Sequence, residues 1–286
     1  MTNSQRQYKD RLFTFIFGSP ENKAWTLSLF NAVNGSNYDN PDDIEITTIK
    51  DILYLTMHND VSFIIDEQMN LYEQQSSYNP NMPLRLFQYA ASLFEQYITN
   101  HKKNRFGPKL LMLPTPKLVV FYNGKKEVAD ETILRLSDSF KDGDKGDIEV
   151  KVRMLNINYG HSQKLLAASA PLKEYSWIIH HIMSYNKEIG LAEAITKVIG
   201  EMPGDFVLKP FMVRHRSEVL DMLLTEYNEV EEREIMCQDA WEDGEASGIK
   251  KAKREDAKKM LALSMDTATI SAVTGLSESD INALKC

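Results

Sequence analysis

Cysteine is scarce in this chain, and long apolar runs are missing. Cys237 and Cys286 are the only two thiols among 286 residues, and they lie far apart in the sequence. Two distant cysteines exclude a disulfide framework and a zinc site built from several thiolates. The longest apolar runs, such as residues 118–122, are far too short to span a bilayer, and the polar N-terminus contains no signal-peptide segment. We therefore expect a cytoplasmic protein without a membrane partner.

The chain also lacks an excess of basic residues. Its 33 Lys and Arg against 41 Asp and Glu give a net charge of −8, which argues mildly against a nucleic-acid partner because phosphate binding normally leaves a basic footprint. The charges are unevenly distributed, however. Residues 226–245 hold nine acids against Arg233 alone, whereas Lys and Arg gather in residues 101–126 and 250–259. Each charge run is typical of a solvated face, and the two basic groups leave DNA open as a partner.

What is present is the composition of a globular protein. Hydrophobic residues make up 43% of the chain and charged residues 26%. A chain of this length can bury one large core or two modest ones.

Residues 59–75 give the clearest indication of a functional site, because they predict a hairpin with polar residues at its ends. Val61, Phe63 and Ile65 alternate with Ser62 and Ile64, which predicts a strand that is largely buried on both faces. Turn-forming and polar residues at 66–70 separate it from a second strand at 71–75, so we expect an antiparallel hairpin with a five-residue connection.

The ends of this hairpin carry the candidate site. Glu73 and Gln75 lie two residues apart and therefore share one face of the second strand. Pairing across the turn brings Asp60 to within a residue or two of Gln75, although the sequence does not give the register. Two carboxylates and an amide that meet in this way are compatible with a metal site.

Apolar periodicity and turn residues divide the first 160 residues into further elements. We expect helices at 9–17, at 19–35 and from Pro83 onward, and strands at 44–55, 117–122 and 148–157. The helix that begins at Pro83 has an expected core stripe of Leu84, Phe87, Ala91, Phe94 and Ile98. This order of elements predicts a mixed α/β sheet with helices packed against it.

The sequence after His161 is helical in pattern. Helices are expected at 163–168, 172–187, 191–199 and from about 217 to 241, followed by a small helical tail. In this tail Asp266 and Ser277 precede two short helices joined by Thr-Gly-Leu-Ser, which looks like a helix-turn-helix. We therefore divide the chain into a core at 1–160, a helical extension with the acidic segment at 161–249 and a helix-turn-helix-like tail at 250–286.

Three segments carry a family resemblance: YKDRLFTFIFG, NDVSFIIDEQMNLYEQQSSYNPNMPLR and PKLVVFYNG. With them, roughly residues 8–160 resemble the recombination-promoting nuclease and transposase group of the PD-(D/E)XK nuclease superfamily. The resemblance implies a restriction-endonuclease-like core of helix, three strands, helix and strand. It also implies divalent-metal-dependent cleavage of DNA. The Thr-Gly-Leu-Ser tail is similar to a C-terminal segment often attached to this group.

The resemblance assigns roles to residues of this chain. Asp60 and Glu73 would hold Mg²⁺, or Mn²⁺ in its place, Gln75 would position the attacking water, and Lys9 and Asp10 in the first helix would support the site. Mg²⁺ takes oxygen ligands and commonly one or two carboxylates, which fits Asp60 and Glu73. Gln75 stands where the superfamily usually has Lys, and an amide cannot supply that positive charge. On the helix from Pro83, Arg85 and Gln88 face either the substrate phosphates or solvent.

Three functions are compatible with this sequence. The first is a DNA endonuclease that depends on Mg²⁺ or Mn²⁺ and acts in recombination or transposition. The second is a nuclease-fold protein with weak or no catalysis that binds DNA or acts in assembly, which Gln75 and the net negative charge favour. The third is an acidic homo-oligomer whose long helices form an interface.

Overall fold

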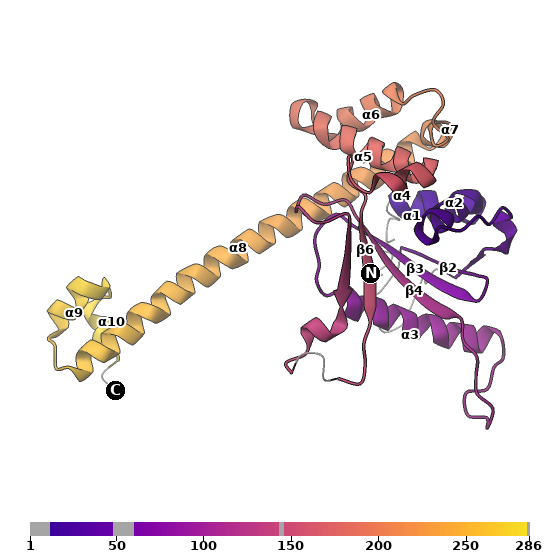
Figure 1. Cartoon of the computed structure of the whole chain (residues 1–286). Helices are drawn as coiled ribbons and strands as arrows, with labels where there is room; N and C mark the ends of the chain where they lie inside the picture. Colours follow the sequence, from indigo (N-terminus) through magenta and orange to yellow (C-terminus); the bar gives the residue numbers. More distant parts are fainter. Residues whose placement is uncertain (1–11, 48–59, 143–145, 285–286) are drawn as a thin grey trace, which may run out of the picture. The chain divides into compact units, whose positions relative to one another are not determined.

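The computed structural model describes residues 12–47, 60–142 and 146–284. Contacts divide the chain into two compact units, Met1–Glu226 and Tyr227–Cys286. The first unit is a mixed α/β fold, and the second is helical (Figure 1), as the sequence predicts. The boundary between the units falls inside the long helix α8 (Arg216–Ala262). The three-part division at residues 160 and 249 stays a prediction.

The first unit is built on a six-stranded sheet in the order β1-β2-β3-β4-β6-β5. Strands β1, β2 and β3 are antiparallel, β3, β4 and β6 run parallel to one another, and β5 is antiparallel to β6. The strands are β1 (Glu45–Ile46), β2 (Val61–Ile65), β3 (Gln68–Gln75), β4 (Thr115–Tyr122), β5 (Glu131–Arg135) and β6 (Lys151–Asn156). The residues expected to continue the strand of β1 beyond Thr47 lie outside the described part of the chain.

Strand β5 is absent from the sequence prediction. It is an edge strand of five residues, of which only Leu134 is buried. An edge strand with one buried position has too little apolar alternation to be recognised from its sequence.

The hairpin between β2 and β3 is tighter than predicted. The turn consists of Asp66 and Glu67, both with positive φ (47° and 59°), as a two-residue mirror-image turn requires. Strand β3 therefore begins at Gln68, and Met69 and Asn70 are buried strand residues. The predicted five-residue connection is wrong because this turn lacks the usual glycine and so gives no short-loop signal.

Helices cover both faces of the sheet (Figure 1). The core on one face is shared by six helices, of which α6 and α7 pack on other helices: α1 (Leu12–Phe17), α2 (Lys23–Asn34), α4 (Gln163–Ala168), α5 (Ala170–Ile189), α6 (Leu191–Glu201) and α7 (Lys209–Arg214). Short 3-10 turns lie at Pro20–Asn22, Pro41–Asp43 and Leu136–Ser139. Aromatic rings link these helices to the sheet: between ring centroids, Phe13 of α1 lies 5.2 Å from Phe121 of β4, and Phe30 of α2 lies 6.0 Å from Phe63 of β2. The helices predicted at 163–168, 172–187 and 191–199 are confirmed as α4, α5 and α6 and share this core. The helix predicted from about 217 to 241 begins as expected, but α8 continues to Ala262, and α7 was not predicted.

Helix α3 (Met82–Asn100) packs on the opposite face. Its buried positions are Met82, Pro83, Leu86, Tyr89, Ala90 and Leu93. The predicted core stripe is wrong, since Leu84 and Phe87 are 47% and 39% exposed. Apolar residues occupy two stripes at helical spacing on this helix, and periodicity alone cannot decide which of them faces the sheet.

The second unit ends in two short helices whose capping was predicted correctly. These helices, α9 (Thr267–Thr274) and α10 (Glu278–Asn282), pack with α8 around Ala257, Ile270 and Ile281. Asp266 caps α9 by accepting from the Thr269 amide at 2.9 Å. Ser277 caps α10 by accepting from the Asp280 amide at 3.1 Å. Among the described residues, no helix has the length and apolar character needed to cross a membrane.

Candidate active site at the β2–β3 hairpin

The register of the hairpin brings the predicted site residues onto one face of the sheet. Val61 pairs with Tyr72, so Asp60, one residue earlier, stands opposite Glu73. Glu73 and Gln75 share the parity of Met69 and Leu71, which pack toward α3. The carboxylates of Asp60 and Glu73 thus arise from adjacent strands on the α3 face of the sheet, with Gln75 two residues further along β3.

Hydrogen bonds between the two strands hold these acids together. The Asp60 carboxylate accepts from the Gln74 amide at 2.7 Å through Oδ2, and the Asp60 amide donates to Glu73 Oε1 at 3.2 Å. Glu73 is 2% exposed. A carboxylate buried to this degree requires a compensating cation or strong donors, because burial removes its hydration.

Arg85 supplies positive charge next to Glu73. Its Nη2 lies 3.6 Å from Glu73 Oε2 and donates to the Tyr89 hydroxyl at 3.2 Å. Burial disfavours the charge on Arg85, but the Tyr89 hydroxyl and the Glu73 and Asp60 carboxylates outweigh it and raise the pKa of the guanidinium above its ordinary value. Arg85 therefore remains a cation beside the two acids.

Tyr89 belongs to the same cluster and was missed by the sequence analysis. Burial raises the pKa of Tyr89, and the charges of Glu73 and Asp60 raise it further against the opposing effect of Arg85. The phenol therefore stays protonated at neutral pH. Its four-residue spacing from Arg85 on a helix was the available signal, since such residues share a face.

Four further residues were predicted to belong to the site. No hydrogen bond or ion pair within the described part of the chain joins the side chain of Gln75 or Gln88 to the two acids, and Lys9 and Asp10 are not described. Gln75 is buried and lies beside Tyr122 of β4, and its carbonyl accepts from the Asn123 amide at 3.1 Å. Gln88 is half-buried on α3, and no contact within the described residues joins its side chain to Asp60 or Glu73. Lys9 and Asp10 lie outside the described part of the chain.

The oxygen ligands that Asp60 and Glu73 can supply suit a divalent metal ion that prefers oxygen. Within residues 12–47, 60–142 and 146–284, no group of three or more His, Cys, Asp or Glu side chains is placed to hold an ion. A structural zinc site needs four protein ligands, whereas Mg²⁺ is commonly bound by one or two carboxylates with water and substrate phosphate. Two carboxylates on neighbouring strands therefore suit Mg²⁺ or Mn²⁺.

The fold and the tail define a mixed α/β protein with a C-terminal helix-turn-helix. Residues 250–285 match the family model described as the Rpn/YhgA-like nuclease family, C-terminal HTH domain. The match covers only the tail, and it supports the resemblance to recombination-promoting nucleases that the sequence suggests. Comparisons with curated proteins and with solved structures returned no match.

Proposed function

We propose that this chain is a divalent-metal-dependent DNA endonuclease of the recombination-promoting type, with a PD-(D/E)XK-like catalytic core. The observation that carries this proposal is the position of Asp60 opposite Glu73, next to the Val61–Tyr72 pair, with a 3.2 Å hydrogen bond from the Asp60 amide to Glu73 and with Arg85 3.6 Å from Glu73. The order of elements agrees with such a core, since α1 and α2 precede β1, β2 and β3, and α3 and β4 follow. The family match of the tail supports the same class.

Each residue of the site has a role in this proposal. Asp60 and Glu73 would hold Mg²⁺ or Mn²⁺, which when bound lowers the pKa of a water and neutralises developing phosphate charge. The Gln75 amide would orient the attacking water. Arg85 would donate to the substrate phosphate, because a guanidinium matches phosphate geometry and keeps its charge. Tyr89 would position Arg85 through the hydrogen bond between them.

Arg85 also accounts for the absence of the usual lysine. Gln75 cannot stabilise the negative charge that develops on the phosphate, but a guanidinium from α3 can do so from a different element. The cation would then come from the helix that follows β3 instead of from β3 itself.

Nicking of supercoiled plasmid by the full chain with Mg²⁺ or Mn²⁺ tests this function. We expect the wild type to nick and Glu73→Gln to fall to the rate measured in EDTA. Glu95→Gln is the matched control, because Glu95 is an exposed acid on α3 that pairs with Arg105. Equal nicking by the wild type and Glu73→Gln would refute the catalytic assignment.

A second candidate function is DNA binding by a nuclease fold that does not cut. Gln75 in place of the usual lysine and the match of the tail to an HTH domain favour it. This function predicts salt-dependent DNA binding without hydrolysis in either metal. Homo-oligomerisation stays a separate prediction, for which a mass measurement in solution is the test.

A further inference from the structure

A small cavity lies where the carboxyl ends of β4 and β6 meet helix α5. It has a volume of about 210 Å³, and its lining includes Asn123, Asn158, Tyr159, Ser176 and His180. Ligands of α/β proteins characteristically bind at the carboxyl ends of parallel strands. Because β3, β4 and β6 are parallel, this cavity and the candidate active site lie at the same end of the sheet.

A short connection joins the cavity to the candidate active site. Asn123 follows β4, and its amide donates to the Gln75 carbonyl at 3.1 Å. Its Oδ1 accepts from Gln74 Nε2 at 2.6 Å. The cavity lies on the α5 face of the sheet and the candidate active site on the α3 face, and Asn123 joins them at the shared strand end. A nucleic-acid strand that reaches both would therefore cross this end of the sheet.

Part of the cavity lining is aromatic. Tyr159 is 53% exposed, and its ring stacks on His180 with centroids 4.7 Å apart and planes 24° from parallel. Burial and the neighbouring His181 lower the pKa of His180, so its ring is neutral at neutral pH. Ile157, which is buried, adds an apolar residue to the lining. Such a surface favours a flat ring system over a charged group.

The cavity lining also contains polar groups that can form hydrogen bonds. Ser176 is 3% exposed, and within the described part of the chain its hydroxyl has no hydrogen-bond partner. A buried hydroxyl without a partner is unfavourable. A ligand that bonds to it would add a hydrogen bond without breaking an existing one in the protein.

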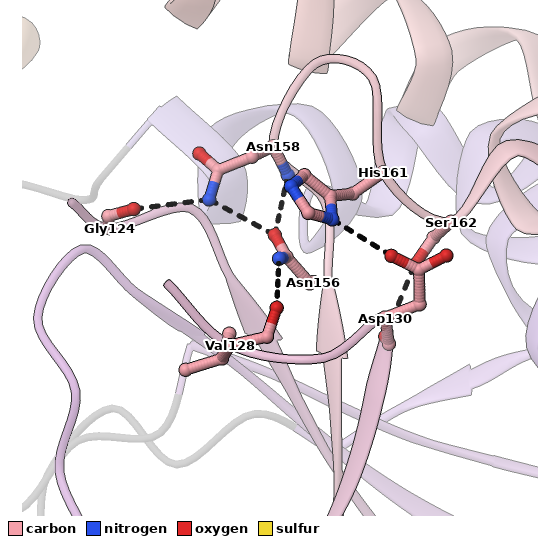
Figure 2. Close-up of polar contacts among 7 residues, drawn as sticks. All are labelled: Gly124, Val128, Asp130, Asn156, Asn158, His161 and Ser162. Carbon is pink, nitrogen blue, oxygen red and sulfur yellow. Dashed lines mark hydrogen bonds and ion pairs between the residues drawn. The ribbon is translucent and has the colours of Figure 1, made fainter. Parts of the chain in front are cut away.

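Asn158 is held with its amide oxygen available (Figure 2). Its Nδ2 donates to the Gly124 carbonyl at 3.1 Å and to Asn156 Oδ1 at 3.0 Å. Asn156 in turn donates to the Val128 carbonyl at 3.0 Å. Because the NH₂ group is used within this network, the Oδ1 of Asn158 is left as the acceptor for a ligand.

We propose that this cavity binds one unpaired nucleobase of the DNA strand that the candidate site cleaves. A nucleobase has a flat face to stack beside Tyr159 and His180, and an edge with the donors and acceptors that Asn158 and Ser176 complement. The volume of 210 Å³ is smaller than the roughly 300–1,000 Å³ of pockets for drug-sized ligands, which suits a single ring system. This inference rests on the proposed function and makes single-stranded or frayed DNA the preferred substrate.

Direct binding without cleavage tests the proposal. The full chain in EDTA is titrated against a fluorescent single strand of twelve thymidines, and against a strand of equal length and charge whose sugars are abasic. We expect the wild type to bind the base-bearing strand about tenfold more tightly, as one stacked base contributes. Tyr159→Ala should abolish this preference and Tyr159→Phe should keep it. Ser176→Ala should reduce the preference.

A control and the contrary results complete this test. Phe106→Ala removes an aromatic side chain that is 91% exposed and lies between α3 and β4, at the other end of the sheet, and it should behave like the wild type. Equal affinity of the wild type for both strands would overturn the proposal, and so would a preference that survives in Tyr159→Ala.

The nuclease proposal and the cavity proposal fail separately. Glu73→Gln should lose plasmid nicking and keep the preference for bases in EDTA. A wild type that nicks plasmid without this preference refutes only the cavity. A wild type that shows the preference without nicking supports the cavity and refutes only the catalysis.

Discussion

Glu73 is the residue on which the proposed chemistry depends. It is the more buried of the two acids and contacts groups from two further elements, the Asp60 amide and the Arg85 guanidinium. Without a metal, Arg85 balances part of its charge. A metal ion held by Asp60 and Glu73 would take over the neutralisation of Glu73, and Arg85 would then be able to donate to a substrate phosphate.

Replacing Arg85 tests this exchange. We expect Arg85→Ala to lower the rate of plasmid nicking about tenfold or more, since a hydrogen bond to a charged group contributes about 1.5–3 kcal/mol. Its affinity for Mn²⁺ should be unchanged or higher, because a competing cation has been removed from Glu73. Nicking rates and calorimetric titration with Mn²⁺ measure the two effects. Weaker Mn²⁺ binding would show that Arg85 does not compete with the metal.

Gly124 lines the cavity and has no space for a side chain. A Cβ at this position would lie 2.2 Å from the Ser76 carbonyl oxygen and 2.6 Å from the Tyr122 hydroxyl. We expect Gly124→Ala to destabilise the first unit by about 1–3 kcal/mol, which is typical of overpacking. Urea unfolding measures this, with Gly200→Ala in α6 as control, since a Cβ there meets nothing within 4 Å. Equal unfolding midpoints for the two variants would contradict this account of Gly124.

At the scale of elements, the sequence predicts best those features that depend only on neighbouring residues. The caps at Asp266 and Ser277 follow from residues within a few positions of each other. The parity of Glu73 and Gln75 follows from strand geometry alone.

Long-range packing determines the features that the sequence did not predict, namely the buried face of α3 and the register of the hairpin. Helix α3 has two apolar stripes, and only contact with the sheet selects the one that contains Leu86 and Leu93. That choice places Arg85 beside Glu73 and brings Tyr89 into the cluster. The register that sets Asp60 opposite Glu73 likewise depends on the two-residue turn at Asp66 and Glu67.

The cap of α9 makes a prediction about pH. The Thr269 hydroxyl and amide donate to the Asp266 carboxylate and hold its pKa below the ordinary value of 3.8. Because the unfolded tail binds the proton more readily, the stabilisation is present at neutral pH and is lost as pH falls below 3.8 through the lowered pKa. Hydrogen-exchange protection of the Thr269 amide should therefore fall over this acid range. Asp266→Ala should have low protection at every pH, and wild-type protection in this variant would disprove the role of the cap.

At the scale of the whole molecule, the two units divide the proposed work. The first unit holds the sheet and both proposed sites, and the second ends in the segment that matches an HTH domain.

In the segment that matches an HTH domain, α10 carries Glu278 and Asp280 and neither Lys nor Arg. Lys251, Arg254 and Lys258 are exposed on α8 at helical spacing. The chain's basic groups can thus contact phosphates in spite of its net charge of −8.

Neutralising this stripe tests its contribution to DNA binding. We expect the triple variant Lys251→Ala, Arg254→Ala and Lys258→Ala to bind duplex DNA more weakly and with a shallower dependence on salt, by about 0.9 in the log–log slope for each phosphate that is no longer neutralised. The decrease in affinity should be similar for unrelated DNA sequences, because binding to phosphates carries no base information. Anisotropy titrations at several salt concentrations measure both quantities. An unchanged slope would show that these three residues do not contact DNA phosphates.

Crystals of the full chain soaked in Mn²⁺ give the most direct test of the central claim. If Asp60 and Glu73 form the metal site of a nuclease, anomalous density will appear between their two carboxylates and will be lost in Glu73→Gln. Saturating Mn²⁺ with no density there, or with density only elsewhere on the chain, would contradict the assignment of the site.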